Sequence, residues 1–210
     1  MTCSSAIKSQ RVSNIGSDKI VVRLGGIYAL EGVINTSEQY HQPVLEALSA
    51  FVRDSTRNET GEGPPATDVQ AALTVIGRRI PVFAFRPEIV RITPFRTTAG
   101  GTVAFRAPGP NLDFVHIPKA NLILAILNEV SLEDADLSGA NLFGAYLMGA
   151  HLSGANLSSA NLIGARLALA QLYGANLSFA CLSGADLSRA DPQAREISPR
   201  SSWMRFAGHR

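Results

Sequence analysis

The sequence predicts an α+β protein in which a small helical domain precedes a long domain of short repeats. Two observations predict this order. From Asn111 onward a large apolar residue returns every five positions, whereas the segments before it place their apolar residues at helical spacing. The composition, with 46% apolar residues and 17% charged residues, is that of a globular chain with room for one or two domains.

The repeat is regular over sixteen consecutive units, whose central position runs from Leu112 to Leu187 and is leucine in all but one. Alanine stands two positions before thirteen of these residues, and glycine stands two positions after seven of them. A period of five matches neither the 3.6 of a helix nor the 2 of a strand, so a single long helix is excluded. Glycine suits a tight turn, so each unit is expected to be a short extended piece followed by a corner.

The stretch ADLSGANLFGAYLMGAHLSGANLSSANLIGARL resembles the A(D/N)LXX pattern of the pentapeptide-repeat proteins. The resemblance covers residues 111–191. It implies a right-handed quadrilateral β-helix of about four coils, with four pentads in each coil. It also implies that the central leucine and the preceding alanine point inward. In the middle of the repeat these core positions are Leu137, Leu142, Leu147, Leu152, Leu157, Leu162, Ala140, Ala145 and Ala150.

Three helices are expected in the helical domain, which we place at residues 18–79. Apolar spacing predicts helices over 20–33 and 44–52. A third helix is predicted from Thr67, with Gln70 completing a capping box, to a glycine at position 77.

The segments VRLGGIYALE, LEALSAFVRD and ATDVQAALTVIGRR resemble a helical, HEAT-like region that precedes the repeats in a bacterial subgroup of the family. In that subgroup the region commonly follows membrane-spanning helices, and this chain has no such segment. Gly25 and Gly26 lie inside the first predicted helix, where they indicate close helix packing.

Three segments match neither part. Residues 1–17 are expected to be an N-terminal tail. Residues 80–110 contain three short β-prone runs, which predict a linker or a cap on the repeat. Residues 192–210 leave the repeat pattern at a proline and form a basic C-terminal tail, for which the sequence leaves two alternatives open: a cap on the last coil, or a disordered segment.

If four pentads make a coil, residues twenty apart stack on the outside. This register gathers an apolar stripe, which the sequence predicts to be an interaction surface: Ile123, Leu124, Ile126, Phe143, Tyr146, Met148, Ile163 and Leu169. An exposed apolar area of this kind indicates a covered surface. Its cover is the chain's own segment 80–110 or its helices, a second copy in a homodimer, or a foreign protein.

Acidic residues gather near the first two coils, at Asp113, Glu133, Asp134 and Asp136. Some pentapeptide-repeat proteins that protect DNA gyrase are thought to imitate duplex DNA, so the resemblance implies a second use for this acidic patch. Residues 111–190 hold six acidic and three basic groups, which is a modest charge, and a solvated charged surface explains it better than DNA mimicry does.

No catalytic pattern accompanies the four histidines, and His116 and His151 are expected to be surface substitutions. We therefore expect no enzyme, no cofactor and no metal site. A formal net charge of +2 argues against direct nucleic-acid binding, and two cysteines 178 residues apart are typical of the reducing cytoplasm. No uninterrupted apolar run is long enough for a membrane-spanning helix, and the first 20 residues lack the hydrophobic core of a signal peptide.

These expectations combine into one function and two alternatives. The chain is predicted to be a non-enzymatic scaffold for protein binding. The first alternative is a DNA mimic that binds DNA gyrase or another topoisomerase. The second is a truncated remnant of a membrane-anchored relative.

Overall fold

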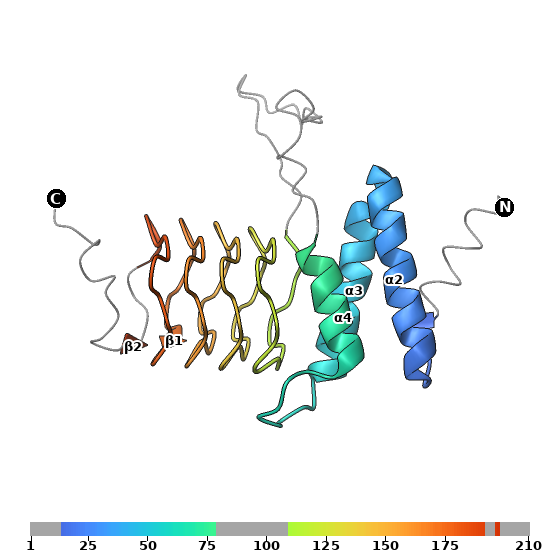
Figure 1. Cartoon of the computed structure of the whole chain (residues 1–210), viewed down its shortest axis with the longest axis horizontal. Helices are drawn as coiled ribbons and strands as arrows, with labels where there is room; N and C mark the ends of the chain where they lie inside the picture. The colour runs from blue at the N-terminus through green and yellow to red at the C-terminus, as the bar shows by residue number, and fades with distance from the viewer. Residues whose placement is uncertain (1–13, 79–108, 192–195, 198–210) are drawn as a thin grey trace, which may run out of the picture.

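The computed structural model describes residues 14–78, 109–191 and 196–197. It consists of a bundle of three helices and a stack of coils, which follow one another along the long axis of the molecule (Figure 1). The predicted cap at 80–110 lies almost wholly outside the described residues, as do residues 1–13 of the predicted N-terminal tail.

The three predicted helices are present as α2 (Ile20–Thr36), α3 (His41–Thr56) and α4 (Thr67–Gly77), with a short 3-10 helix η1 (Glu38–Tyr40) before α3. Each of the three α-helices contacts the other two. Their shared core contains Ile27, Leu48, Val52, Ala72 and Ile76, which are all fully buried. The bundle is therefore held by apolar burial from all three helices.

Two details of the helices differ from the sequence-based expectation. The residue before α4 is Ala66, and no side chain caps the helix, so the capping box predicted for Thr67 and Gln70 is wrong. The Gln70 amide bonds instead to the first coil. Gly25 is exposed, and a Cβ placed there would meet no atom within 4 Å, so close packing does not explain this glycine.

The repeat forms four stacked coils. Parallel bridges join residues twenty apart, from Asn111 with Ser131 to Arg166 with Asp186. Each bridge is made by the residue before a central apolar position, and the backbone bonds between coils are regular. For example, Asn141 N donates to Ala120 O at 2.9 Å, and Leu142 N donates to Asn161 O at 2.8 Å.

The coils contain almost no continuous strand. Two residues of each pentad form a turn, which leaves a single bridging residue between consecutive corners. The predicted coil of four pentads is thus present, but the pairing within it consists of isolated bridges rather than extended sheets.

The interior of the stack is filled by the leucines and alanines of the pentads. The central leucines and preceding alanines between Leu137 and Leu162 are all at most 1% exposed. Because every coil repeats the same side chains, each leucine lies between two others along the axis. The core is therefore a set of continuous leucine and alanine ladders.

The coil register continues beyond residue 191. The strand β1 (Asn176–Leu177) pairs in parallel with β2 (Glu196–Ile197), again at a spacing of twenty residues. Asp191 N also donates to Ala170 O at 3.0 Å, in the pattern of the preceding coils. β2 covers part of the last coil's edge, which is the place expected for a cap. The rest of the predicted tail at 192–210 lies outside the described residues.

At the other end of the stack, α4 lies nearest to the first coil (Figure 1). Gly77 O accepts a hydrogen bond from Ile126 N at 2.7 Å, in the place of a carbonyl from a preceding coil. The Gln70 side-chain amide bonds to both the N–H and the C=O of Asn121, at 2.9 and 2.8 Å. These bonds satisfy backbone groups that the first coil would otherwise leave unpaired.

Two further features close this junction. Arg53 of α3 donates to the carbonyl oxygen of Asn111 and, at 3.1 Å, to its Oδ1. A Cβ at Gly77 would lie 2.8 Å from the Cβ of Ala125, so α4 approaches the coil closely only because this residue is glycine. The helical bundle is thus the N-terminal cap of the coil stack.

Candidate interaction surface

The apolar stripe begins as a ladder on one side of the coils. Bridges from Asn121 through Asn141 to Asn161 set its register, and the residues two positions after them are Ile123, Phe143 and Ile163. Their side chains are 46%, 46% and 36% exposed. The helices pack against the end of the stack (Figure 1). The exposed fractions of the three side chains show that the helices do not cover this ladder.

Leu124 extends the stripe around a corner. Its backbone has φ 55°, a left-handed conformation that is costly for leucine, and its side chain is 59% exposed. A Cβ at Gly144, in the next coil, would lie 2.8 Å from the Leu124 Cδ2 atom. The glycine at this corner therefore leaves the space in which the Leu124 side chain lies.

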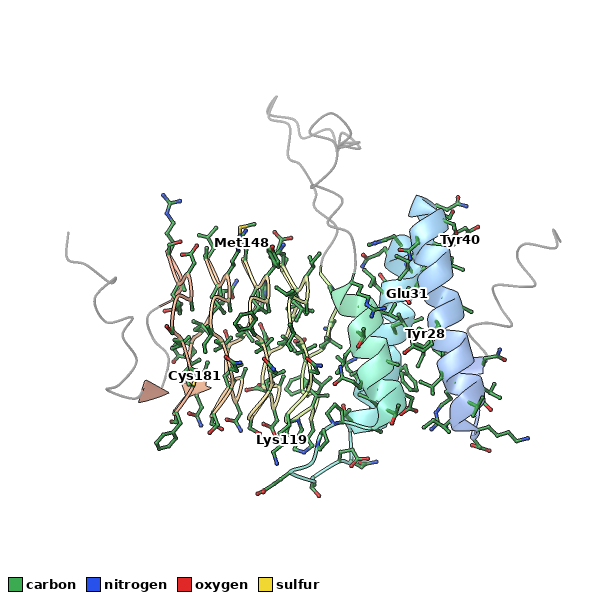
Figure 2. The ribbon with its side chains drawn as sticks, viewed as in Figure 1. Tyr28, Glu31, Tyr40, Lys119, Met148 and Cys181 are labelled. Carbon is green, nitrogen blue, oxygen red and sulfur yellow. The ribbon has the colours of Figure 1, made fainter. Side chains whose placement is uncertain are left out.

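The next side of the coil carries the rest of the stripe. Ile126 bridges to Tyr146, and both are half-buried. The Arg166 guanidinium lies 4.8 Å from the centre of the Tyr146 ring, so a cation covers part of this surface. Met148 and Leu169 are exposed beyond it, and Figure 2 shows Met148 projecting from the outer edge of the stack.

Two carboxylates of the acidic patch accept hydrogen bonds from neighbouring residues. Asp113 accepts from Glu133 N at 2.9 Å. Asp136 Oδ1 accepts from Ser138 N at 3.0 Å and from Asn156 Nδ2 at 3.0 Å. Asp113 and Asp136 therefore already accept hydrogen bonds from neighbouring residues of the coils.

Both coil histidines lie beside acidic residues. His116 Nδ1 is 2.9 Å from Asp136 Oδ2, and its Nε2 is 2.8 Å from the carbonyl oxygen of Gly61. His151 Nδ1 is 3.9 Å from Glu133 Oε1. The expectation that His116 is a simple surface substitution is therefore wrong, because it joins the coils to the helical bundle.

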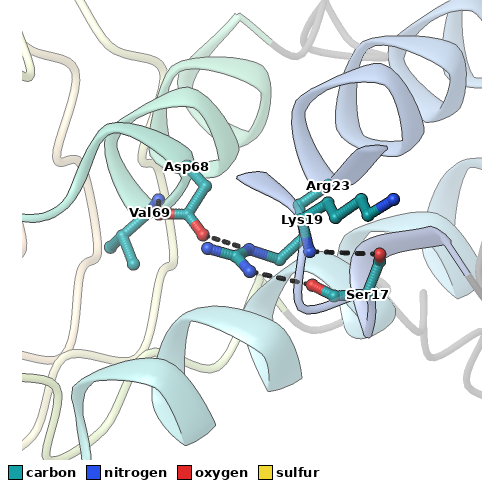
Figure 3. Close-up of polar contacts among 5 residues, drawn as sticks. All are labelled: Ser17, Lys19, Arg23, Asp68 and Val69. Atoms are coloured by element: carbon teal, nitrogen blue, oxygen red, sulfur yellow. Dashed lines mark hydrogen bonds and ion pairs between the residues drawn. The ribbon is translucent and has the colours of Figure 1, made fainter. Parts of the chain in front are cut away.

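A charge-paired cavity lies where the bundle meets the coils. It has a volume of about 650 Å³ and is lined by the start of α2, the end of α3, the α3–α4 loop and the first coil. Figure 3 shows Arg23 Nε bonded to the buried Asp68 Oδ2 at 2.6 Å, with Arg23 Nη1 donating to Ser17 O at 2.8 Å. Asp68 is one of the few buried charged residues among those described, and Arg23 compensates it.

Three exposed aromatic residues were not predicted as part of a surface. They are Phe114, Tyr173 and Phe179, and each is more than 60% exposed. Phe114 and Phe179 occupy left-handed corners, with φ 59° and 60°. All three stand at outward pentad positions, so the repeat register contained the signal, but they lie apart from the stripe.

Two further observations concern chemistry. Among residues 14–78, 109–191 and 196–197, no group of three His, Cys, Asp or Glu side chains is placed to hold a metal ion. The pKa of Asp186 lies below its usual range, chiefly because the Ser188 backbone N–H donates to its carboxylate at 3.0 Å.

No helix in the described part of the chain is long and apolar enough to cross a membrane.

Comparison with known proteins identifies the repeat. A family model of pentapeptide repeats matches in eight copies, over residues 111–144, 118–154 and 150–189. No curated protein matches the chain.

The similar solved structures include a pentapeptide repeat protein from Nostoc PCC 7120. It is 36% identical, with 45% of this chain and 79% of that chain covered and a TM-score of 0.42. A pentapeptide repeat protein from the thylakoid lumen of Arabidopsis thaliana is 27% identical, with 40% and 58% covered and a TM-score of 0.38. QnrB1, a plasmid-mediated fluoroquinolone resistance protein, is 23% identical, with 40% and 48% covered and a TM-score of 0.23. The chain thus spans little more than half of the Arabidopsis protein and about half of QnrB1.

Proposed function

The chain is a pentapeptide-repeat protein over residues 111–189, and from this premise we propose that it is a non-enzymatic scaffold that binds another protein through the apolar stripe. The observation that carries the proposal is the exposed ladder of Ile123, Phe143 and Ile163 on a stack of coils. Family membership further implies that the stack is a right-handed quadrilateral β-helix.

Rigidity supports a binding role. The ladder residues are attached to a backbone that is hydrogen-bonded coil to coil and to a core without exposed leucine, so their positions are fixed before a partner arrives. A preformed surface loses little conformational entropy on binding. The proposal therefore requires no rearrangement of the coils.

The chemistry of the stripe also fits a protein partner. Isoleucine, leucine, phenylalanine and methionine side chains supply apolar area, and Tyr146 with Arg166 adds the residue types that are common at the centre of interfaces. A second copy of the chain, a different protein and the chain's own segment 80–110 are the three occupants to be separated by experiment.

The first experiment compares the wild type with Phe143→Glu by size-exclusion chromatography with light scattering. The matched control is Ser158→Glu, which places the same charge on the polar side of the coils. If the stripe pairs two copies, the wild type is a dimer, Phe143→Glu is a folded monomer, and Ser158→Glu remains a dimer. A wild-type monomer leaves the stripe to a different protein or to the chain's own segment 80–110.

The second experiment identifies that protein. A photoreactive amino acid is placed at position 143 or, as the control, at position 158, and the protein is crosslinked in its host cell. A partner captured from position 143 alone supports the stripe. Equal capture from both positions, or binding that Phe143→Glu leaves unchanged, would refute the proposed surface.

The alternative that the chain is a DNA mimic for a topoisomerase can be tested by replacing residues of the acidic patch. A DNA mimic depends on Glu133, Asp134 and Asp136, so their replacement by lysine would abolish protection or inhibition of DNA gyrase in a supercoiling assay. A scaffold that uses the stripe would tolerate these replacements and fail with Phe143→Glu. Asp136 already accepts hydrogen bonds from Ser138 and Asn156 within the coils, which favours the scaffold.

A further inference from the structure

Among the described residues, one hydrogen bond joins the loop between α3 and α4 to the coils, and it is made by a histidine ring. His116 Nε2 lies 2.8 Å from the carbonyl oxygen of Gly61, in the loop at residues 57–66. Its Nδ1 lies 2.9 Å from Asp136 Oδ2, one coil further along. The ring thus spans two parts of the molecule that are 55 and 20 residues away from it in sequence.

The two partners of this ring are both hydrogen-bond acceptors. A peptide carbonyl has no proton to donate, and the Asp136 carboxylate already accepts from Ser138 N and Asn156 Nδ2 through its other oxygen. A neutral imidazole has one N–H and so satisfies one of the two. The charged carboxylate is the stronger acceptor, so the proton remains on Nδ1 facing Asp136, and Nε2 then has no proton for the Gly61 carbonyl. Only the imidazolium form donates from both nitrogens at once.

Most of the charged groups around the ring are carboxylates. The cavity that His116 lines also contains Asp18 before α2, Asp54 in α3 and Glu59 in the loop. Arg23 of α2 and Asp68 of α4 line it too, but they neutralise each other. On the coils, Asp136 faces the ring directly, and Lys119 lies over Gly139. Carboxylates therefore outnumber the remaining cation.

The other hydrogen bonds between the helical bundle and the first coil do not involve this ring. Arg53 bonds to Asn111, Gln70 bonds to Asn121, and Gly77 bonds to Ile126. Loss of the His116 bond to Gly61 would therefore free the loop while the helices remain docked. The loop contributes Gly61, Gly63, Pro64 and Pro65 to the wall of the cavity, so its release would open that wall.

We propose that residues 57–66 form a pH-sensitive strap, which the doubly protonated His116 ring holds closed between Gly61 and Asp136 and which opens when the ring loses a proton. Imidazoles ordinarily titrate near pH 6.5, which lies within the range that cells and their compartments reach. This inference is independent of which partner binds the apolar stripe.

The test uses the whole chain and two measurements. Nitrogen NMR of the His116 ring reports how many ring protons are present between about pH 5.5 and 8.5. Hydrogen-exchange protection of the loop amides, including Gly61 and Gly63, reports opening, and protection factors remove the intrinsic pH dependence of exchange. We expect loop protection to fall about tenfold as the ring loses its proton, because a charge-assisted hydrogen bond is lost.

Two variants serve as controls. His116→Gln has no titrating ring, so its loop protection is expected to be low and independent of pH. His151→Gln removes a histidine at the equivalent pentad position that contacts Glu133 but not the helical bundle, so its loop is expected to respond like the wild type.

Three results would overturn the strap. The first is loop protection in the wild type that is the same across the pH range. The second is a ring that carries one proton while the loop remains protected. The third is a pH response of the loop that persists in His116→Gln. The first two need no variant, so they remain decisive if a substitution prevents folding.

Discussion

Leu142→Ala tests the inward register of the repeat most directly. Leu142 is 1% exposed, and Leu122 and Leu162 stack on either side of it along the axis. Truncation to alanine removes three carbon atoms, or about 2.4 kcal/mol at about 0.8 kcal/mol each. The rigid coils on both sides cannot collapse into the space, so a cavity cost is added. We expect a loss of about 3 kcal/mol in the free energy of unfolding.

Two further variants test whether the cost of Leu142→Ala comes from its inward position or whether any truncation in the coils costs as much. Phe143→Ala changes the next residue, which points outward and is 46% exposed, so its cost is expected to stay below about 1 kcal/mol. Leu182→Ala lies in the last complete coil at 4% exposure, near the edge of the described stack. Its cost is expected to be smaller than that of Leu142→Ala, because fewer atoms surround the void.

The assay is urea unfolding at about 25 °C followed by circular dichroism, with wild-type and variant slopes compared before free energies are extracted. A cost of Leu142→Ala below about 1 kcal/mol would refute the inward ladder. So would a cost of Phe143→Ala equal to or above that of Leu142→Ala.

Three other variants test the helical bundle and the last coil. Ser49→Ala is expected to stabilise the fold by about 1 kcal/mol in the same urea assay. The reason is that Ser49 Oγ is buried and, within the described residues, has no hydrogen-bond partner. Destabilisation would mean that the hydroxyl has a partner. Gly25→Ala is expected to add about 0.5–1 kcal/mol, since the site is exposed, helical and open to a Cβ; an unchanged midpoint would contradict this. The lowered pKa of Asp186 means that its carboxylate stabilises the fold above the ordinary aspartate value of 3.8, and that this contribution is lost as pH falls through the lower folded value. Carbon NMR of the carboxyl group should therefore place its titration midpoint below 3.8, and Ser188→Pro, which removes the donor N–H, should raise it.

The coils were predictable because their information is local and repeated. One pentad specifies an inward leucine, a small residue before it and a corner after it, and sixteen pentads specify the same geometry. The twenty-residue stacking follows from the family resemblance, and that spacing alone is enough to place Ile123, Phe143 and Ile163 in one ladder. The helices were predictable from apolar spacing for a similar reason.

The junction was not predictable, because its contacts join residues that have no sequence relation. Gln70 has the spacing of a helix-capping residue, but its amide bonds to Asn121, 51 positions later. His116 occupies an outward pentad position, but the docked loop supplies Gly61 as its second partner. Each residue's role depends on how the bundle sits on the first coil, and that arrangement is a property of tertiary packing.

The turn positions of the pentads all have a positive φ, and some carry glycine whereas others carry larger side chains. Seven corners use glycine, which adopts a positive φ without strain. Leu124 and Leu169 adopt the same backbone at φ 55° and 62°, each at a cost of roughly 1–2 kcal/mol, and their side chains are 59% and 52% exposed. Neither strain nor exposure stabilises the monomer. The same backbone is adopted at corners that carry Lys119, Glu129, Asp134, Ser159 and Arg189, so the strained corner is a property of the coil, and the exposed side chain alone sets Leu124 and Leu169 apart.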